Sequence, residues 1–375
     1  MKLPEGDMKD LTSKIVVSGY YGYNNIGDEA ILKGLLDGVG AVTDSEILVL
    51  SKNPDWTKLK YKVEAEDRSN VFQVLKAIFT CDMLISGGGS LLQDVTSKRS
   101  ILYYLFIIFI AKIFRKKVFI YSQGIGPINL KLNRFLTKFI LNRVDFINVR
   151  DNKSRDELIN LGVKKDILVT TDTVFGIEKP SLESGKKIID SLNPNKNRKK
   201  VGANFINWKD NGQRTIEEAV KALKIVLQDN SNDVYLIPFY YHVDLEIARK
   251  IYDILKIDYK NIFLVENYLY VDEYLSLVGN MDLMVSMRLH GLIFSTLMEV
   301  YPIGISYDPK IDGFLRELKR PTNFHVEDFD GEKLAEEILS SLSNIDYLRK
   351  ETISNLGKFL NLTSKHNLAV AKILN

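Results

Sequence analysis

The segment Ser286-Met287-Arg288-Leu289-His290-Gly291 combines residue types that bind an anion and move a proton. The apolar residues before it predict a strand at 281–286, and those after it predict a helix. Arg288 carries a permanent, planar charge that suits phosphate or carboxylate, and His290 can donate or accept a proton near neutral pH. A histidine at a strand end is often only a hydrogen-bonded structural residue, but the three types together favour an active site. We therefore predict that Arg288 and His290 are catalytic.

Three other charged residues follow strand-like segments, and ligands of parallel sheets bind beyond such strand ends. Lys310 comes after the strand expected at 302–307, so it is either a second cation for the same anion or a solvated loop lysine. Arg150 ends a strand expected at 145–150, and it either reaches the site or forms an ion pair that caps the next helix. Asp172 stands between two threonines at another strand end, where it could act as a base or hold a sugar.

Glycine clusters also lie at the expected strand ends, where they would let the backbone approach a ligand closely. The longest spans residues 19–27, and its Asn25 side chain suits sugar hydroxyls. A second cluster, Gly87-Gly88-Gly89, predicts close approach of a ligand or of the opposing domain, unless it is only a crowded turn. The third spans residues 124–126. None has the GxGxxG spacing of dinucleotide binders or the lysine of a P-loop, so neither NAD nor ATP is indicated.

Strands alternate with helices along the whole chain, which predicts mainly parallel sheets covered on both faces. The expected strands are 14–19, 46–50, 82–86, 118–122, 145–150, 167–170, 200–204, 233–237, 261–265, 281–286 and 302–307. We predict an α/β protein of two Rossmann-like doubly wound domains that face a cleft. Residues 1–180 form the first domain, which the C-terminal helix 355–375 joins, and residues 201–354 form the second. The Pro-, Lys- and Asn-rich segment 181–200 is expected to link them.

The composition narrows the class of protein. The chain has 375 residues, 45% of them apolar and 26% charged, which indicates a globular protein of about two domains. A net charge of only +3 does not favour a nucleic-acid binder. The single cysteine, Cys81, excludes an intramolecular disulfide and a Cys-based metal site, and no histidine has metal-ligand spacing with acids, so we expect no metal. The N-terminus lacks the apolar core of a signal peptide, which favours a cytoplasmic protein.

The most apolar stretch, residues 101–114, is followed by the basic run Arg115-Lys116-Lys117. At about 14 residues it is shorter than the roughly 20 that a membrane-spanning helix needs. It is either a buried helix or a helix at a membrane surface, with the basic run next to anionic lipid. Peripheral contact with the inner face of a membrane through 101–117 is therefore one of two alternatives for this segment.

Taken together, these segments resemble the polysaccharide pyruvyl transferases, particularly those of the CsaB type. The resemblance runs in order along residues 14–310, and single motifs are weak but the ordered set is specific. The motifs are Ser18-Gly19-Tyr20-Tyr21-Gly22, Asn25-Ile26-Gly27-Asp28-Glu29-Ala30, Ser86-Gly87-Gly88-Gly89 with Gln93-Asp94, Gln123-Gly124-Ile125-Gly126-Pro127, Arg150-Asp151 with Ser154, Thr171-Asp172, and Ser286-Met287-Arg288-Leu289-His290-Gly291. Residues 1–13 and 205–265 do not share in it.

Members of this family move pyruvate from phosphoenolpyruvate onto two hydroxyls of one sugar, as a cyclic ketal, and release phosphate. The CsaB type acts on N-acetylmannosamine of a lipid-linked cell-wall polysaccharide precursor. The resemblance thus implies a GT-B-like fold, with phosphoenolpyruvate as donor substrate and no cofactor. The residues it assigns to phosphoenolpyruvate are Arg150, His290 and Lys310. Those it assigns to the acceptor side are Ser18, Asn25 and Gly88.

The residues suit such a reaction. Phosphoenolpyruvate carries a phosphate and a carboxylate, so it needs two or three fixed cations, and its methylene carbon must gain a proton. We expect His290 to be the general acid or the phosphate partner, Arg288 to bind anion, and Asp172 to be a base for the sugar. A nucleotide-sugar glycosyltransferase of the same architecture would also need Arg and Lys, for its diphosphate. A non-catalytic subunit that binds a sugar or lipid precursor is the third alternative.

Overall fold

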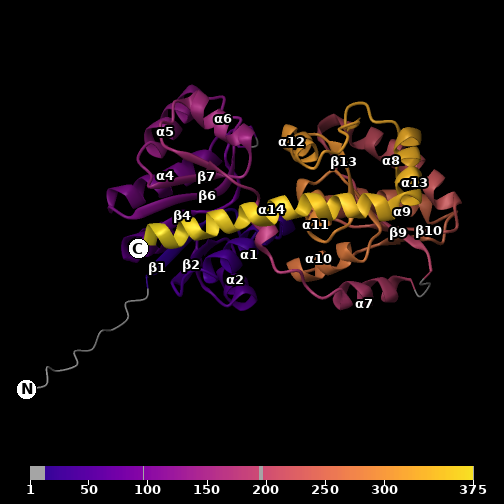
Figure 1. Ribbon diagram of the computed structural model, residues 1–375, viewed down its shortest axis with the longest axis horizontal. Helices are drawn as coiled ribbons and strands as arrows, with labels where there is room; N and C mark the ends of the chain where they lie inside the picture. The colour runs from indigo at the N-terminus through magenta and orange to yellow at the C-terminus, as the bar shows by residue number, and fades with distance from the viewer. Residues whose placement is uncertain (1–12, 96, 194–196, 375) are drawn as a thin grey trace, which may run out of the picture. The chain divides into compact units, whose positions relative to one another are not determined.

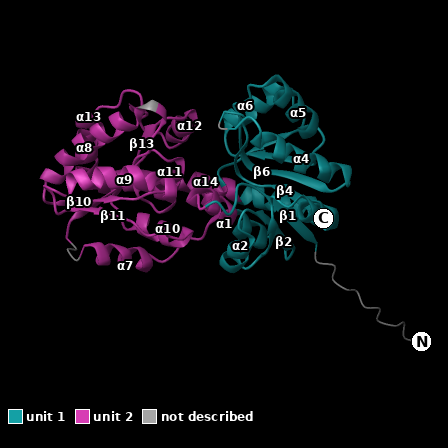
Figure 2. Cartoon of the chain, turned by 180° about the vertical axis from the view of Figure 1, so that it is seen from behind, with its two compact units in different colours: residues 1–23, 35–172, 364–375 teal, residues 24–34, 173–363 magenta. Residues whose placement is uncertain are grey.

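The computed structural model describes residues 13–95, 97–193 and 197–374, and the chain forms two compact units (Figure 1). Among these residues, unit 1 comprises 13–23, 35–172 and 364–374, and unit 2 comprises 24–34 and 173–363 (Figure 2). Each unit is built on one parallel β-sheet with helices on its faces. The predicted α/β class with two doubly wound sheets is therefore confirmed.

The sheet of unit 1 has eight parallel strands in the order β3-β2-β1-β4-β6-β7-β8, with β5 paired to β6 beside this path. The bounds are β1 Lys14–Ser18, β2 Glu46–Ser51, β3 Glu64–Asp67, β4 Met83–Ser86, β5 Gly89–Leu92, β6 Lys117–Ile125, β7 Phe146–Val149 and β8 Ile167–Val169. The strand order reverses between β1 and β4. At such a reversal the loops after the strands diverge and leave room for a ligand.

Helices cover both faces of this sheet, so most residues of its central strands are buried. The bounds are α1 Ile26–Gly40, α2 Pro54–Tyr61, α3 Val71–Thr80, α4 Ser100–Ile113, α5 Lys131–Leu141 and α6 Asn152–Leu161. Apolar side chains of α3, α4 and α5 share one core with β1, β4 and β6. Helix α1 begins in unit 2 and ends in unit 1.

The sheet of unit 2 has six parallel strands in the order β11-β10-β9-β12-β13-β14, and its order reverses between β9 and β12. The strands are β9 Lys199–Asn204, β10 Asn232–Leu236, β11 Ile262–Leu264, β12 Leu283–Ser286, β13 Tyr301–Ser306 and β14 Phe324–His325. The helices are η1 Thr173–Gly176, α7 Glu183–Leu192, η2 Lys209–Asn211, α8 Gly212–Gln228, α9 Tyr241–Leu255, α10 Val271–Gly279, α11 Leu289–Leu297, α12 Pro309–Glu317, α13 Gly331–Ser343 and α14 Ile345–Leu374.

Every strand expected from the sequence is present, and most of these apolar runs are buried by their sheet, whereas β8 is only partly buried. The strands that the sequence did not indicate are β3, β5 and β14. Strand β3 reads Glu-Ala-Glu-Asp at one edge of its sheet, and β14 has two residues at the edge of the other. Their pairing depends on neighbouring strands rather than on an apolar pattern of their own.

The segment 181–200, expected to be a linker, contains helix α7. The helix packs against α10, and the backbone N–H of Gly185 donates to the Ser276 hydroxyl at 2.7 Å. A Cβ at Gly185 would lie 2.3 Å from the Ser276 carbonyl carbon, so the two backbones touch. The chain passes between units at 172–173, before α7, and it re-enters unit 1 at Ser364 within α14.

Helix α4 covers the apolar stretch after residue 100 and has two different sides. Ile101, Leu105 and Ile108 are buried in the core of unit 1, whereas Phe106 and Phe109 are exposed. In the described part of the chain, no helix combines the length and the apolar character needed to cross a bilayer. The stretch therefore forms a buried helix on one side and exposes an aromatic surface on the other.

Candidate functional site

Strand β12 leads directly into helix α11, and the turn between them positions Arg288. The Ser286 hydroxyl donates to the Arg288 carbonyl at 2.9 Å and accepts from the Arg288 N–H at 3.0 Å. A Cβ at Gly291 would lie 2.2 Å from the Ser286 Oγ, so only glycine allows this close turn. Ser286 is fully buried, and the turn is held from inside the sheet. Arg288 is the residue that precedes the first turn of α11.

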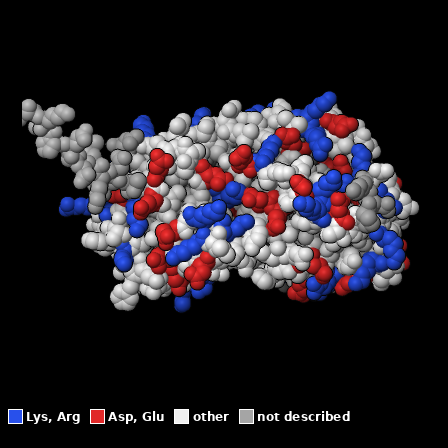
Figure 3. All heavy atoms as spheres, turned by 90° about the horizontal axis from the view of Figure 1, so that it is seen from below, with Lys and Arg blue, Asp and Glu red and all other residues white. Residues whose placement is uncertain are grey.

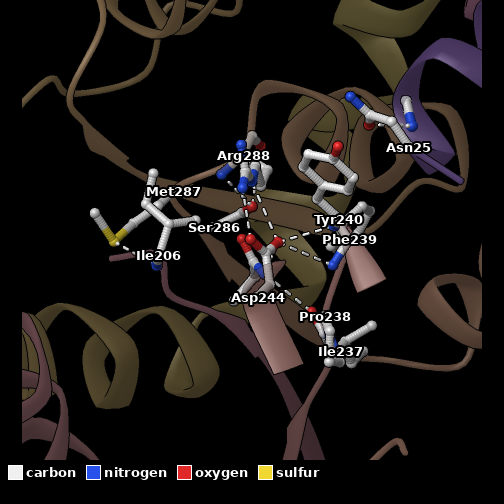
Figure 4. A network of polar contacts seen from close by, with 12 residues as sticks. Asn25, Ile206, Ile237, Pro238, Phe239, Tyr240, Asp244, Ser286, Met287 and Arg288 are labelled. Atoms are coloured by element: carbon white, nitrogen blue, oxygen red, sulfur yellow. Dashed lines mark hydrogen bonds and ion pairs between the residues drawn. The ribbon is translucent and has the colours of Figure 1, made fainter. Parts of the chain in front are cut away.

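Arg288 is bound by Asp244, as Figure 4 shows. The Arg288 Nε and Nη2 donate to the two Asp244 carboxylate oxygens, at 3.2 and 2.5 Å. Asp244 is fully buried and also accepts from the N–H groups of Phe239 and Tyr240 and from the Asn204 amide, at 3.2, 2.9 and 3.2 Å. Burial acts to lower the pKa of Arg288, but Asp244 outweighs it and raises that pKa. Asp244 therefore holds the guanidinium charged and in one orientation.

His290 lies in the first turn of α11, against the first turn of α1. A Cβ at Gly27 would lie 2.0 Å from the His290 Nδ1, so the imidazole contacts the backbone of Gly27. The Asn25 side chain accepts from the Gly27 N–H at 3.2 Å and so caps α1, and Asn25 also forms a backbone bridge with Tyr240. Helix N-termini favour negative charge. Two of them meet at His290, which suits an anion bound next to the imidazole.

Replacing Gly27 with alanine should displace the His290 ring, because the new methyl group would overlap it. We expect about a 10²-fold loss of turnover, the effect of moving a catalytic group by about 1 Å. The control is Gly40→Ala at the other end of α1, where an added Cβ meets nothing within 4 Å. Steady-state kinetics of both variants measure the effect, and equal activity of the two would contradict this placement of His290.

Lys310 lies in the first turn of α12, beyond the end of β13. Strands β12 and β13 are neighbours, so Arg288, His290 and Lys310 occupy the same carboxyl edge of the unit 2 sheet. The Asp308 side chain accepts from the Lys310 N–H at 3.0 Å, and the Lys310 Nζ is 3.5 Å from the Asp308 carboxylate. This ion pair is partly exposed, and such pairs hold a lysine only weakly.

Arg150 and Asp172, the other predicted site residues, belong to unit 1 and lie together. The Arg150 Nη1 donates to Asp172 at 3.0 Å, and its Nη2 donates to the Ser90 hydroxyl at 3.1 Å. Arg150 is 7% exposed and Asp172 is 5% exposed. A Cβ at Gly124 would lie 2.7 Å from the Arg150 Nη2, so this glycine makes room for the guanidinium. The guanidinium is thus held between Asp172 and Ser90 in the interior of unit 1.

The helix-capping alternative for Arg150 is also present in the structure. Asp151 caps α6 by accepting from the Ser154 N–H at 2.7 Å, and its carboxylate is 3.7 Å from the Arg150 Nε. Arg150 therefore contacts two carboxylates, and its charge is largely compensated inside unit 1.

A buried histidine that the sequence did not indicate lies behind Asp172. His366 comes from α14, and its Nδ1 is 3.1 Å from the Thr170 hydroxyl. The Thr170 hydroxyl also accepts from the Asn148 amide at 2.8 Å. Burial lowers the pKa of His366 to about 4, and the nearby Asp172 only partly offsets this. The histidine is therefore a neutral hydrogen-bonding residue that supports the segment leading to Asp172.

Unit 1 should become less stable as pH falls from 6.5 to 4, because in this range His366 is neutral in the folded chain but protonated in the unfolded chain. The pKa is about 4 in the folded chain and 6.5 ordinarily, so the unfolded chain binds more protons between these values. Above pH 6.5 His366 does not reduce the unfolding free energy of unit 1, and by pH 4 this free energy has fallen by about 3 kcal/mol. Denaturant unfolding of His366→Asn should lack this contribution. Trp56 fluorescence in a Trp208→Phe background reports on unit 1, and identical pH profiles with and without His366 would contradict the assignment.

Gly19 after β1 and Gly87 after β4 both pack against Tyr21. This packing explains why glycine is needed at these two positions without a bound ligand. A Cβ at Gly19 would lie 2.2 Å from the Tyr21 ring, and one at Gly87 would lie 2.2 Å from its hydroxyl. Ser18 is 1% exposed, and Gly88 is also buried. Of the predicted acceptor residues, Ser18 and Gly88 thus lie buried in unit 1, each next in the chain to a glycine that contacts Tyr21, while Asn25 lies in unit 2.

An aromatic cage around Arg68 was also not indicated by the sequence. The Arg68 guanidinium donates to the Gly19 carbonyl at 2.7 Å and to the Tyr104 hydroxyl at 3.2 Å. It also lies over the ring of Tyr103, 4.5 Å from its centre. Tyr20 and Tyr23 stack in parallel, 4.0 Å apart, beside it. This places a buried cation and an aromatic platform at the carboxyl ends of β1 and β3, in unit 1.

Within residues 13–95, 97–193 and 197–374, no three His, Cys, Asp or Glu side chains are grouped so that they could hold a metal ion. The charged groups brought together are instead Arg288, His290 and Lys310 in unit 2, and Arg150 with Asp172 in unit 1. The residues that position them and that sequence reasoning missed are Asn204, Asp244, Ser90 and His366. Their positions depend on contacts between segments far apart in the chain.

Solved structures similar to this chain share its fold. A protein from Listeria monocytogenes described as a UDP-N-acetylglucosamine 2-epimerase is 14% identical, with a TM-score of 0.66 over 96% of each chain. The UDP-GlcNAc 2-epimerase of Neisseria meningitidis, bound to UDP-GlcNAc, is 13% identical, with a TM-score of 0.64 over 97% of this chain and 100% of that one. The ADP-heptose LPS heptosyltransferase II of E. coli is 12% identical, with a TM-score of 0.51 over 89% and 100%. These likenesses show a GT-B-like fold.

Among proteins with curated functions, none matches the chain by sequence. The model of one protein family does match, along residues 25–309. This range contains Asn25 and Gly27, the Arg150–Asp172 pair and the Arg288–His290 turn, and so includes the charged groups of both units apart from Lys310. Because the match covers most of the chain, the protein belongs to the polysaccharide pyruvyl transferase family.

Proposed function

We propose that this enzyme transfers pyruvate from phosphoenolpyruvate onto two hydroxyls of one sugar in a lipid-linked cell-wall polysaccharide precursor. The observation that carries the proposal is the grouping of Arg288, His290 and Lys310 at one edge of the unit 2 sheet. N-acetylmannosamine is the acceptor that the resemblance implies. The enzyme would work in the cytoplasm, at the inner face of a membrane, where a lipid-linked substrate is presented.

Unit 2 has the groups that phosphoenolpyruvate requires. A phosphate next to His290 would lie at the N-terminal ends of α1 and α11, which favour negative charge. Lys310, on the neighbouring strand end, supplies a second cation that is only weakly paired. Arg288 is fixed by Asp244, so we assign it to orientation of the anion rather than to proton transfer. Arg150 remains a candidate phosphoenolpyruvate ligand.

The reaction needs one acid and one base. A proton added to the methylene carbon makes a methyl group, and a sugar hydroxyl forms a C–O bond to the adjacent carbon. The C–O bond to phosphate then breaks, and the second hydroxyl closes the ketal. Both hydroxyls give up their protons, which balance the proton gained by the methylene carbon and the one taken up by the leaving phosphate. His290 is the candidate acid, or it holds the phosphate as it leaves. Asp172 remains the candidate base, although Arg150 must release it or share it for that role.

Candidate groups for the acceptor are Asn25 in unit 2 and a set of side chains in unit 1. The Tyr20–Tyr23 stack offers an aromatic face of the kind that lines ligand sites, and Arg68 offers a buried cation beside it. Ser18 and Gly88 remain candidate acceptor residues. Their chain neighbours Gly19 and Gly87 contact Tyr21.

A donor assay tests this proposal. The protein is incubated with a sugar acceptor and either phosphoenolpyruvate or a panel of nucleotide sugars, and released phosphate and nucleotide are both measured. We expect acceptor-dependent phosphate release from phosphoenolpyruvate alone. Nucleotide release would instead support a glycosyltransferase, which the fold shared with enzymes named for nucleotide sugars makes the second candidate. Lack of binding and turnover with every donor and acceptor would favour a non-catalytic subunit.

A further inference from the structure

We propose that helices α3, α4 and α5 of unit 1 form a surface that docks on an anionic lipid bilayer. We call it the three-helix surface and define it by the exposed apolar side chains Phe72, Phe79, Phe106, Phe109, Ile113, Leu132, Phe135 and Phe139. Each is at least 37% exposed. The inference goes beyond sugar transfer, and it would hold for any donor that the enzyme uses.

The three helices lie side by side on one face of their sheet. Helix α4 contacts both α3 and α5, and Figure 1 shows α4 and α5 on the same side of β4, β6 and β7. Their buried side chains, among them Ile78, Ile108 and Ile140, belong to one apolar core with the strands. Their exposed side chains must therefore face away from that sheet together.

The exposed apolar residues follow helical spacing, so each helix presents a stripe. In α4, Phe106, Phe109 and Ile113 are three and four residues apart. In α5, Leu132, Phe135 and Phe139 have the same spacing. Residues so spaced lie on one side of a helix. Neither stripe is covered within the described residues, although each helix already buries its opposite side in the core.

Ring contacts join α3 to the end of α4 and extend along α5. Phe79 of α3 lies edge-on to Phe114 at the end of α4, with ring centres 5.4 Å apart. Phe135 and Phe139 of α5 stack 6.2 Å apart. The guanidinium of Arg143 lies 3.7 Å from the centre of the Phe139 ring. Aromatic residues next to basic ones are typical of proteins that rest in the interface of a membrane.

The charge of this region is complementary to anionic lipid. Residues 71–143 contain 11 lysines and arginines and two aspartates, although the whole chain has a net charge of only +3. One of the two acids, Asp94, is 5% exposed and is bound by the N–H groups of Asn129 and Leu130. On the face that Figure 3 shows, by contrast, basic and acidic side chains are interspersed.

These features select a lipid surface over a second copy of the chain. Two copies would bring like charges together, which opposes association. An anionic bilayer attracts the basic residues near it and accepts aromatic side chains at its interface. Helix α4 lies along such a surface rather than through it, because its other side is part of the core of unit 1.

The test is co-sedimentation of the full chain with vesicles of phosphatidylcholine alone or with one-third phosphatidylglycerol. We expect binding to the anionic vesicles, weaker binding to neutral ones and a decrease as salt rises. Phe106→Ser/Phe109→Ser/Phe135→Ser should weaken binding to anionic vesicles about tenfold or more. The control is Leu59→Ser on α2, which removes an apolar side chain 83% exposed in the same unit and should bind like the wild type.

Other outcomes would overturn the proposal. These are no binding of the wild type to anionic vesicles, equal loss in Leu59→Ser, or unchanged binding in the triple variant. A dimer that the triple substitution dissociates would show that a second copy covers the surface instead. Circular dichroism and Trp56 fluorescence check that unit 1 is folded in each variant. A second variant, Lys131→Glu/Lys138→Glu on α5, should weaken binding to anionic vesicles but not to neutral ones, and loss to both alike also counts against the proposal.

Discussion

His290→Ala is expected to lower the turnover of phosphoenolpyruvate by about 10²–10⁴-fold, the usual contribution of a general acid or base. The imidazole is set against the first turn of α1 through its contact with Gly27. His290→Gln should recover part of the loss only if the residue holds phosphate by a hydrogen bond. If the residue donates the proton, both variants should be equally slow. The pair of variants therefore separates the two roles.

The matched control for His290 is His325→Ala. His325 is also in unit 2, but its partner is Asp312 at 3.4 Å, and it lies on the edge strand β14. We expect wild-type kinetics for this variant. Near wild-type turnover of His290→Ala would remove His290 from the reaction, and an equal loss in both variants would indicate a general effect on unit 2.

Asp244→Ala should destabilise unit 2 by about 3–5 kcal/mol, because it removes a fully buried carboxylate and leaves a guanidinium that is only 23% exposed without its partner. It also removes the acceptor of the Phe239 and Tyr240 N–H groups, which lie in the turn beside Asn25. Activity should fall as well, since Arg288 would lose its orientation. Asp244→Leu/Arg288→Leu should be less destabilising than Asp244→Ala alone, because removing both charges leaves no unpaired ion.

Denaturant unfolding followed by Trp208 fluorescence in a Trp56→Phe background measures this loss in unit 2. Asp253→Ala is the control on the same helix, because its ion pair with Lys256 is exposed and should contribute less than about 1 kcal/mol. Equal unfolding free energies for Asp244→Ala and Asp253→Ala would show that the buried pair does not hold the site.

The sequence predicted the α/β class and the strands well because both depend on apolar runs, which a parallel sheet buries on both faces. The Arg288–His290 turn was found for the same reason, since it follows such a run directly. Segment 181–200 was misjudged, because its polar residues concealed α7, a helix with few buried side chains. Residues 24–34 belong to unit 2, although they lie in the sequence between two segments of unit 1. No sequence pattern in this segment predicts this, because it depends on which unit the start of α1 packs against.

The partners of the charged residues could not be predicted from the sequence. Asp244 is 44 residues from Arg288, and His366 is 196 residues from Thr170. Nothing near Asp244 in the sequence distinguishes it from an ordinary acidic residue in the first turn of a helix. Only tertiary packing decides which carboxylate is buried, and buried charges are paired. The same holds for Arg68, whose four tyrosines come from two separate segments.

The most direct measurement of pyruvyl transfer is the mass and NMR spectrum of an acceptor after incubation with phosphoenolpyruvate in D₂O. The acceptors are β-N-acetylmannosaminyl and galactosyl glycosides, and the control is the His290→Ala protein. The account predicts a pyruvate ketal on one sugar, with deuterium in the new methyl group and an equal amount of released phosphate. An acceptor that stays unchanged with phosphoenolpyruvate, but gains a sugar from a nucleotide donor, would contradict it.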